Sequence, residues 1–383
     1  MGCDPYILAA LRTPRGKGSA KGALHGIEPV ALVTHVLAAL PADVSRADDF
    51  VLGCANPTGE QAGNLARAAL LESARTSHDR RHFGGVPGVM VNRFCASGLD
   101  AIAIAASKVR AEDASFVIAG GVESVSRVAP PGSLAEIGVA ADLIATLEGV
   151  SREECDAYAH ATREKAKVAP AGASIVPLGG IDRDENIAFQ PTVDELRTMP
   201  VLFDGEAFAS PNANATAWLV AGGVPDELRH VHTRGNSPSL ADAAALTFVG
   251  DGDAARRIGI APRAKIVATA SAAVDPTLML TAGQLAIEKV LAKANVRPAD
   301  IAVFEFAEAF AASCVRFMRA LDVGHDRLNP NGGTIARGHA YGATGAALVV
   351  DALEELERRK GRYAVIGVSG AAGLGSAMLI ERI

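Results

Sequence analysis

Residues 88–121 read GVMVNRFCASGLDAIAIAASKVRAEDASFVIAGG and carry the clearest indication of the fold class. Residues 88–94 form an apolar run that ends at Cys95, as expected for a strand. Apolar residues then recur at helical spacing over 99–109, and Phe116–Ala119 is a second short apolar run. This alternation predicts an α/β protein with a mostly parallel sheet and helices on its faces.

The alternation extends in both directions, with one interruption. From about residue 130 to residue 240, helical stretches give way to turns rich in proline and glycine, which predicts an inserted loop domain. The predicted strands are 5–11, 50–54, 88–94, 116–119, 265–271, 301–306, 363–368 and 377–380. The predicted helices are 29–40, 61–73, 99–110, 133–148, 152–167, 282–294, 309–320 and 346–359. Two α/β halves therefore flank an insertion.

The composition excludes several classes of protein. The chain has 383 residues, of which 49% are hydrophobic and 4% aromatic, and its formal net charge is −6. An acidic chain with few aromatic residues is a poor match for nucleic acid, so we expect no nucleic-acid partner. No apolar run approaches the roughly 18 residues of a membrane span. Five scattered cysteines favour a reduced setting, so we expect a cytoplasmic protein that binds no membrane.

Cys95 is placed where a strand ends and a helix begins. The free N–H groups and the positive dipole end of a helix stabilise a thiolate, and the same N–H groups can hold an oxyanion. Cys95 is therefore a candidate nucleophile. The alternative is a buried structural cysteine, and the local sequence leaves both possibilities open.

Two glycine-rich turns in the last quarter of the chain are further candidates. Asn331–Gly345 holds a single histidine, His339, which could deprotonate a thiol and later protonate a leaving sulfur; a solvated loop histidine is the alternative. Gly367–Gly375 follows a strand and is not a nucleophile elbow, because its fifth position is Ala371. We interpret it as a tight turn that exposes backbone N–H groups.

Taken together, these segments resemble the thiolase family over most of the chain. The matching motifs, in chain order, are Arg12-Thr-Pro14, Gly59–Arg67, Val91-Asn-Arg-Phe-Cys95-Ala-Ser-Gly-Leu, Gly120-Gly-Val-Glu123-Ser-Val-Ser126, Ser151–Asp156, Asp275-Pro276, Glu305-Phe-Ala-Glu308-Ala-Phe310-Ala and Asn331-Gly-Gly…Gly338-His339.

The resemblance implies a five-layer αβαβα fold of two similar halves with an inserted loop domain. It implies an N-terminal half over 1–119, a loop domain that binds coenzyme A over 120–240, a return segment over 241–262 and a C-terminal half over 263–383. A homodimer or homotetramer is implied, with coenzyme A as a substrate and no permanently bound cofactor.

The reaction implied is acyl transfer on acyl-CoA or 3-ketoacyl-CoA thioesters. Cys95 would carry the acyl group and His339 would be its base. Gly370 would lie at an oxyanion-binding backbone, and Phe310 would contribute to substrate binding. Arg229 and Arg234 are candidate partners for the phosphates of coenzyme A, with ordinary surface arginines as the alternative.

The sequence departs from the family pattern at the second half of the mechanism. The family's second catalytic cysteine is Ser369 here, and a serine hydroxyl is a far weaker acid than a thiol of pKa about 8.5. The family's NEAF asparagine, which fixes an oxyanion-binding water, is Ala307. Pro238 replaces a serine that contacts coenzyme A, so Ser237 or Ser239 would stand in.

Two readings of the function remain. The first is a thiolase-type acyltransferase. The second is a thiolase-like protein that binds acyl-CoA or becomes acylated by it but is impaired in carbon–carbon chemistry. We expect no metal site. His78 and His82 are spaced i, i+4, but Asp79-Arg80-Arg81 between them and Gly84-Gly85 after them are typical of a solvated insertion, and His230 with His232 lacks a third ligand at suitable spacing.

Overall fold

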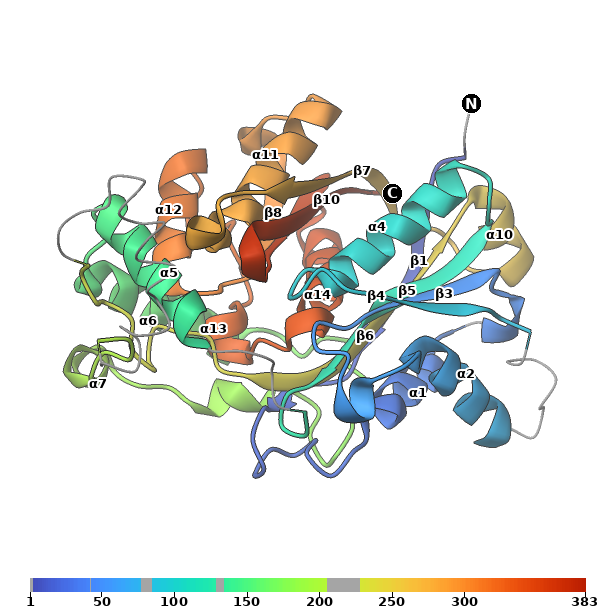
Figure 1. Cartoon of the computed structure of the whole chain (residues 1–383). Coiled ribbons are helices and arrows are strands. Elements are labelled where there is room, and N and C mark those ends of the chain that lie inside the picture. Colours follow the sequence, from blue (N-terminus) through green and yellow to red (C-terminus); the bar gives the residue numbers. More distant parts are fainter. Residues whose placement is uncertain (1–2, 42, 77–84, 129–133, 205–227) are drawn as a thin grey trace.

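A computed structural model of the chain describes residues 3–41, 43–76, 85–128, 134–204 and 228–383 (Figure 1). The described strands run in the order β4-β3-β5-β6-β1-β7-β10-β9-β8, with β2 paired to β6. Their bounds are β1 Tyr6–Arg12, β2 Gly16–Lys17, β3 Asp49–Gly53, β4 Gly88–Val91, β5 Phe116–Ser124, β6 Ala241–Gly250, β7 Ala264–Ala273, β8 Ile301–Phe306, β9 Tyr363–Ser369 and β10 Leu374–Arg382.

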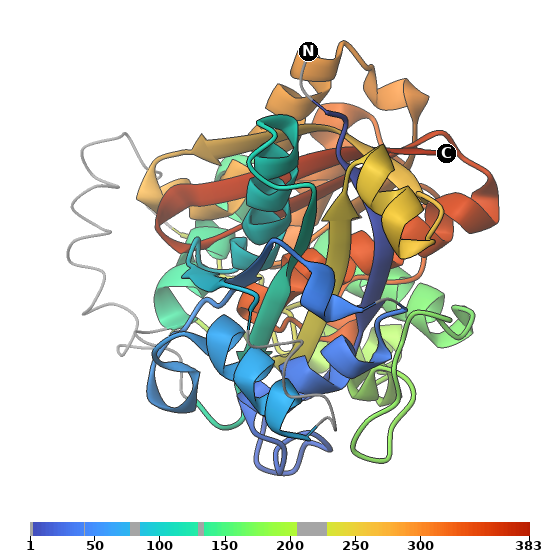
Figure 2. The same ribbon diagram turned by 90° about the vertical axis from the view of Figure 1, so that its right-hand side faces the viewer.

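The sheet joins two halves of the same construction. Counted outward from their junction, where β1 pairs with β7, one half runs β1-β6-β5-β3 and the other β7-β10-β9-β8. Pairing directions match as well: the first two pairs in each half are antiparallel and the third is parallel. Figure 2 shows β1, β6 and β5 of the first half side by side.

Helices form three layers around these strands (Figure 1). Helices α4 and α14 lie between the two groups of strands, in the apolar cluster that contains Leu99, Ile102 and Leu353. On the outer faces, α1, α2 and α10 cover the first half, and α11 and α12 cover the second. The bounds are α1 Pro29–Ala39, α2 Leu65–Thr76, α4 Ser97–Arg110, α10 Gly252–Ile258, α11 Ala282–Ala294, α12 Ala311–Leu321 and α14 Tyr341–Arg359. The five-layer αβαβα prediction is therefore confirmed.

The inserted segment supplies all but one of the remaining described α-helices. They are α5 Leu134–Leu147, α6 Arg152–Val168 and α7 Val193–Thr198, while α13 Thr334–Arg337 belongs to the second half. The turn before α6 is fixed by its sequence, because the Ser151 hydroxyl accepts from the Glu154 N–H and the Glu154 carboxylate accepts from the Ser151 N–H. Within the described ranges, we find no helix both long enough and apolar enough to cross a membrane.

The prediction of a mostly parallel sheet is wrong. Only β3 with β4, β3 with β5, and β8 with β9 are parallel pairs among the described strands. The physical reason is the connections: β9 and β10 are joined by a tight turn, and a short turn permits only antiparallel pairing. β6 also returns antiparallel between β1 and β5 after the insertion.

Candidate active site

One cavity, with a volume of about 210 Å³, brings together residues from distant parts of the chain. Three of them are the candidates Cys95, His339 and Ser369. The other lining residues are Ile137, Leu202, Phe203, Ser237, Pro238, Leu240, Leu280, Ala309, Phe310, Tyr341, Gly370 and Ala371. The lining is mainly apolar, with a few polar groups, which is the character of a small-molecule site.

Cys95 lies in the turn between β4 and α4. The Ser97 hydroxyl braces this turn by accepting from the Arg93 N–H and donating to the Phe94 carbonyl. Burial, followed by the charge of Glu123, raises the pKa of Cys95 to about 12, although a backbone N–H acts in the opposite direction. Desolvation therefore opposes the thiolate that the helix end would stabilise, and the balance favours the thiol form of Cys95.

Glycine contacts bring the start of α4 against the start of α14. A Cβ atom at Gly98 would lie 2.5 Å from the Gly342 carbonyl oxygen, and one at Gly121 would lie 2.3 Å from the same atom. Any side chain at either position would push α14 away. This close approach is what places Cys95, before α4, on the same cavity as His339, before α14.

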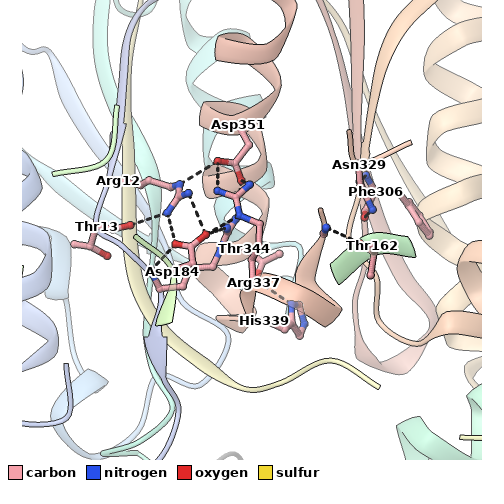
Figure 3. Close-up of polar contacts among 12 residues, drawn as sticks. Arg12, Thr13, Thr162, Asp184, Phe306, Asn329, Arg337, His339, Thr344 and Asp351 are labelled. Carbon is pink, nitrogen blue, oxygen red and sulfur yellow. Dashed lines mark hydrogen bonds and ion pairs between the residues drawn. The ribbon is translucent and has the colours of Figure 1, made fainter. Parts of the chain in front are cut away.

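His339 is held by its backbone and by one ring nitrogen. Its N–H donates to the Ser239 carbonyl at 2.7 Å, and its Nδ1 lies 2.9 Å from the Thr344 hydroxyl (Figure 3). Burial, followed by the positive charge of Arg15, lowers the pKa of His339 to about 4. The imidazole is therefore neutral above pH 5 and can accept a proton through Nε2 when Nδ1 carries the hydrogen.

A buried ionic network lies behind His339 (Figure 3). Arg12, Arg15 and Arg337 each contact both Asp184 and Asp351, at 2.7–3.1 Å between nitrogen and oxygen. Burial opposes the Asp184 carboxylate, but the three arginines lower its pKa well below the usual range. The network ties β1, the inserted segment, α13 and α14 together, and so fixes the backbone on both sides of His339.

Ser369 lines the cavity, but its hydroxyl is already bonded. The hydroxyl donates to the Leu280 carbonyl at 2.7 Å and accepts from the Gly283 N–H at 2.9 Å. The next N–H, that of Gly370, donates to the Leu374 carbonyl at 2.6 Å and is not free to bind an oxyanion. Ala307 is buried, offers only a methyl group and does not line the cavity.

The remaining predicted binding residues separate into two groups. Ser237 and Phe310 line the cavity, where the Phe310 ring packs edge-on against Phe203. The other three lie outside its lining: Ser239 contacts His339 through its carbonyl, Arg229 donates to the carbonyls of Ala145 and Thr146 at the end of α5, and Arg234 is exposed with its guanidinium over the Phe189 ring.

Tyr341 is a cavity residue for which sequence reasoning assigned no role. Its hydroxyl is buried and has no hydrogen-bond partner among the described residues, as is also true of the Ser237 hydroxyl. Its φ of +32° lies in the left-handed region that bulky residues rarely adopt. Its position in the sequence could have indicated a role, because the chain has four tyrosines and this one is the second residue after His339.

Two pairs of histidines were considered as metal ligands, and the structure describes one of these pairs. His78 and His82 lie outside the described residues. His230 and His232 both place Nδ1 on Asp142, at 2.8 and 2.6 Å, and the His232 Nε2 accepts from the Ala312 N–H. This cluster joins α5 to the start of α12 as a structural element. Within the part of the chain that the structure describes, we find no group of three or more His, Cys, Asp or Glu arranged to hold a metal ion.

Comparisons with known proteins identify the family. The family model "Thiolase, N-terminal domain" matches residues 5–134, and "Thiolase, C-terminal domain" matches residues 260–382. A beta-ketoadipyl-CoA thiolase of Acinetobacter baylyi is 32% identical, with 99% of each chain covered. A 3-ketoacyl-CoA thiolase of Bacillus subtilis is also 32% identical, with 99% of each chain covered.

The fold agrees with that result. The crystal structure of the Bacillus anthracis acetyl-CoA acetyltransferase superposes with a TM-score of 0.83 at 26% sequence identity, covering 100% of this chain and 99% of the other. Two matched domains, full-length relatives and a common fold all agree, and the chain therefore belongs to the thiolase family.

Proposed function

We propose that this protein is a thiolase-type acyltransferase that takes the acyl group of an acyl-CoA thioester onto Cys95. The observation that carries the proposal is the single cavity lined by Cys95 and His339, which come from opposite halves of the chain. Relatives whose names specify 3-ketoacyl-CoA and beta-ketoadipyl-CoA thiolases support CoA thioesters as the substrate class.

The proposed first step exchanges one thioester for another. The Cys95 sulfur attacks the thioester carbonyl carbon, its proton passes to the Nε2 of His339, and the carbonyl electron pair moves onto oxygen. When the intermediate collapses, the bond to the CoA sulfur breaks and that sulfur takes the proton from His339. Because burial raises the pKa of Cys95 and lowers that of His339, both groups favour their neutral forms, and the proton moves only as the attack proceeds.

The bonded state of Ser369 favours a second candidate function. Carbon–carbon chemistry needs a group that takes a proton from the α-carbon, and the Ser369 hydroxyl is a weak acid whose hydrogen is engaged by the Leu280 carbonyl. Ala307 has no polar side-chain atom to replace an oxyanion donor. The alternative is accordingly a protein that binds acyl-CoA and becomes acylated, but does not cleave or form carbon–carbon bonds efficiently.

For coenzyme A itself, Ser237 is the better candidate of the two serines, since the residue lines the cavity and its buried hydroxyl is unpartnered among the described residues. Arg234, which is exposed, is the better candidate for the phosphates, because the Arg229 guanidinium is engaged at the end of α5. We propose a homodimer or homotetramer by analogy with the family.

Acylation by acetyl-CoA, followed by intact-protein mass and peptide mapping, tests the proposal. We expect one acetyl group on Cys95, complete loss of the adduct in Cys95→Ala, and retention in the matched control Cys155→Ala, whose sulfur is buried elsewhere. An adduct that survives in Cys95→Ala would exclude Cys95 as the nucleophile. Thiolysis of acetoacetyl-CoA by CoA then separates the two candidates, because the second predicts an adduct without turnover.

A further inference from the structure

Tyr341 combines three properties that the proposed mechanism does not use. It lines the same cavity as Cys95 and His339, and only 7% of the residue is exposed. Its hydroxyl has no hydrogen-bond partner among the described residues. A buried hydroxyl in a native protein is almost always hydrogen-bonded. Because Tyr341 lines the cavity and its buried hydroxyl is unpartnered among the described residues, the phenol points to a partner that arrives with a ligand.

The surroundings of Tyr341 favour a particular kind of ligand atom. Burial, followed by the charges that Cys95 and Glu123 can carry, raises the pKa of the Tyr341 phenol above its usual value, so the group keeps its proton at neutral pH. A protonated phenol offers a hydrogen to an oxygen. The oxygen required by the proposed chemistry is the thioester carbonyl, which gains negative charge as the Cys95 sulfur attacks.

The backbone holds the phenol ring in a defined position. The Tyr341 ring packs edge-on against His339, with ring centroids 5.3 Å apart and planes at 89°. Its φ of +32° is a conformation that a bulky side chain adopts only where surrounding contacts impose it. Here the Gly342 carbonyl packs against the region of Gly98 and Gly121, which fixes the first turn of α14.

We propose that the Tyr341 hydroxyl is a catalytic hydrogen-bond donor to the carbonyl oxygen of the thioester that reacts with Cys95. The proposal rests on the proposed acyl transfer and adds to it a donor for the developing oxyanion, at a site where Ala307 has no side-chain donor and the Gly370 N–H is already bonded. The phenol keeps its proton throughout, so the bonds made and broken are those of the thioester exchange alone.

The test compares two tyrosines that lose the same hydroxyl. Tyr341→Phe keeps the ring and should slow acetylation of Cys95 by acetyl-CoA about 10²-fold, the usual effect of removing one oxyanion donor. Its Tm should stay level or rise, since no hydrogen bond within the protein is lost. Tyr158→Phe is the matched control: the Tyr158 hydroxyl donates to Glu308 at 2.8 Å, so its loss should lower Tm while acetylation stays within about threefold of wild type.

An infrared measurement reads the hydrogen bond directly. In wild-type enzyme acetylated with carbonyl-¹³C acetyl-CoA, the thioester carbonyl stretch should lie below that of free acetyl-CoA carrying the same ¹³C label, and it should move upward in Tyr341→Phe. Equal rates and equal frequencies in wild type and Tyr341→Phe would overturn this inference while leaving Cys95 as the nucleophile. A wild-type enzyme that is not acetylated at all would overturn the proposed function and this inference together.

Discussion

Two turns border the cavity, and they differ in how many of their polar groups are already bonded. The turn before α14 presents the neutral ring of His339 and the unpartnered hydroxyl of Tyr341. The turn after β9 presents Ser369 and Gly370, whose hydroxyl and N–H are both bonded within the protein. A group bonded within the protein must give up that bond before it can serve a substrate. The difference leaves polar groups available to a ligand in the turn before α14 and none in the Ser369–Gly370 pair of the turn after β9.

Of the changes considered, removal of the His339 base from the turn before α14 should have the largest effect on the rate of Cys95 acetylation. His339→Asn should lower the rate of Cys95 acetylation about 10²–10⁴-fold, the usual contribution of a general base. His325→Asn is the matched control, since that residue is exposed, its ring contacts Tyr158 and it does not line the cavity. Quenched-flow mass spectrometry measures both rates. Equal rates in His339→Asn and wild type would remove the basis for contrasting the two turns.

The pH dependence of wild-type acetylation sharpens the same point. Burial and Arg15 lower the pKa of His339 to about 4, so the base stays neutral as pH falls through 6.5 and becomes protonated only near pH 4. The rate should therefore stay level from pH 7 to pH 5 and decline below that. The stability contributed by the neutral ring is present above pH 6.5 and decreases as pH falls toward 4. A rate that halves near pH 6.5 would show that the ring is not desolvated.

A change in the turn after β9 should have a smaller effect than the loss of His339, and it should raise a rate rather than lower one. Ser369→Cys should raise thiolysis of acetoacetyl-CoA by about 10-fold or more, because a thiol is a much stronger acid than a hydroxyl. Acetylation of Cys95 by acetyl-CoA should not change. Ser369→Ala is the control and should leave acetylation within about threefold while lowering Tm, since the Gly283 N–H loses its acceptor. Unchanged or reduced thiolysis in Ser369→Cys would contradict the limiting role given to the serine.

The smallest expected effect is on the free energy of unfolding, and it concerns the backbone of the turn after β9. Ala372 has a φ of +55°, a left-handed conformation that costs an alanine roughly 1–2 kcal/mol. Ala372→Gly should raise the free energy of unfolding by up to about 1 kcal/mol, after the greater flexibility of unfolded glycine is subtracted. Ala371→Gly, at a position without positive φ, should lower it by about 0.5–1 kcal/mol. Urea unfolding measures both, and equal signs for the two variants would contradict the strain at Ala372.

Local periodicity was sufficient for some elements and not for others. Helix α11 over Ala282–Ala294 and strand β8 over Ile301–Phe306 have the predicted bounds. Helix α14 begins at Tyr341 rather than Ala346, because Gly342 and Gly345 have the composition of a turn, yet they serve close helix packing. Strand β6 was not predicted, because a run dominated by alanine lacks the branched and aromatic residues typical of strands.

The candidate site was predictable where its residues carry reactive groups. Cys95, His339 and Ser369 were each singled out from the sequence, and they line one cavity. The bonded state of Ser369 was not predictable, because its partners at Leu280 and Gly283 are backbone atoms far away in the chain. The raised pKa of Cys95 was missed for a similar reason: desolvation depends on how the two halves close over the sulfur.

The network that fixes the backbone around His339 also constrains how the protein is made. Its first arginine, Arg12, is separated by 339 residues from its partner Asp351. A ribosome adding about 5–20 residues per second needs on the order of tens of seconds to cover that distance. During that interval, Arg12 and Arg15 have no Asp351 to neutralise them and must remain hydrated. A chain that ends before Asp351 would therefore lack half of the ionic contacts made by Arg12 and Arg15, and would keep only those to Asp184.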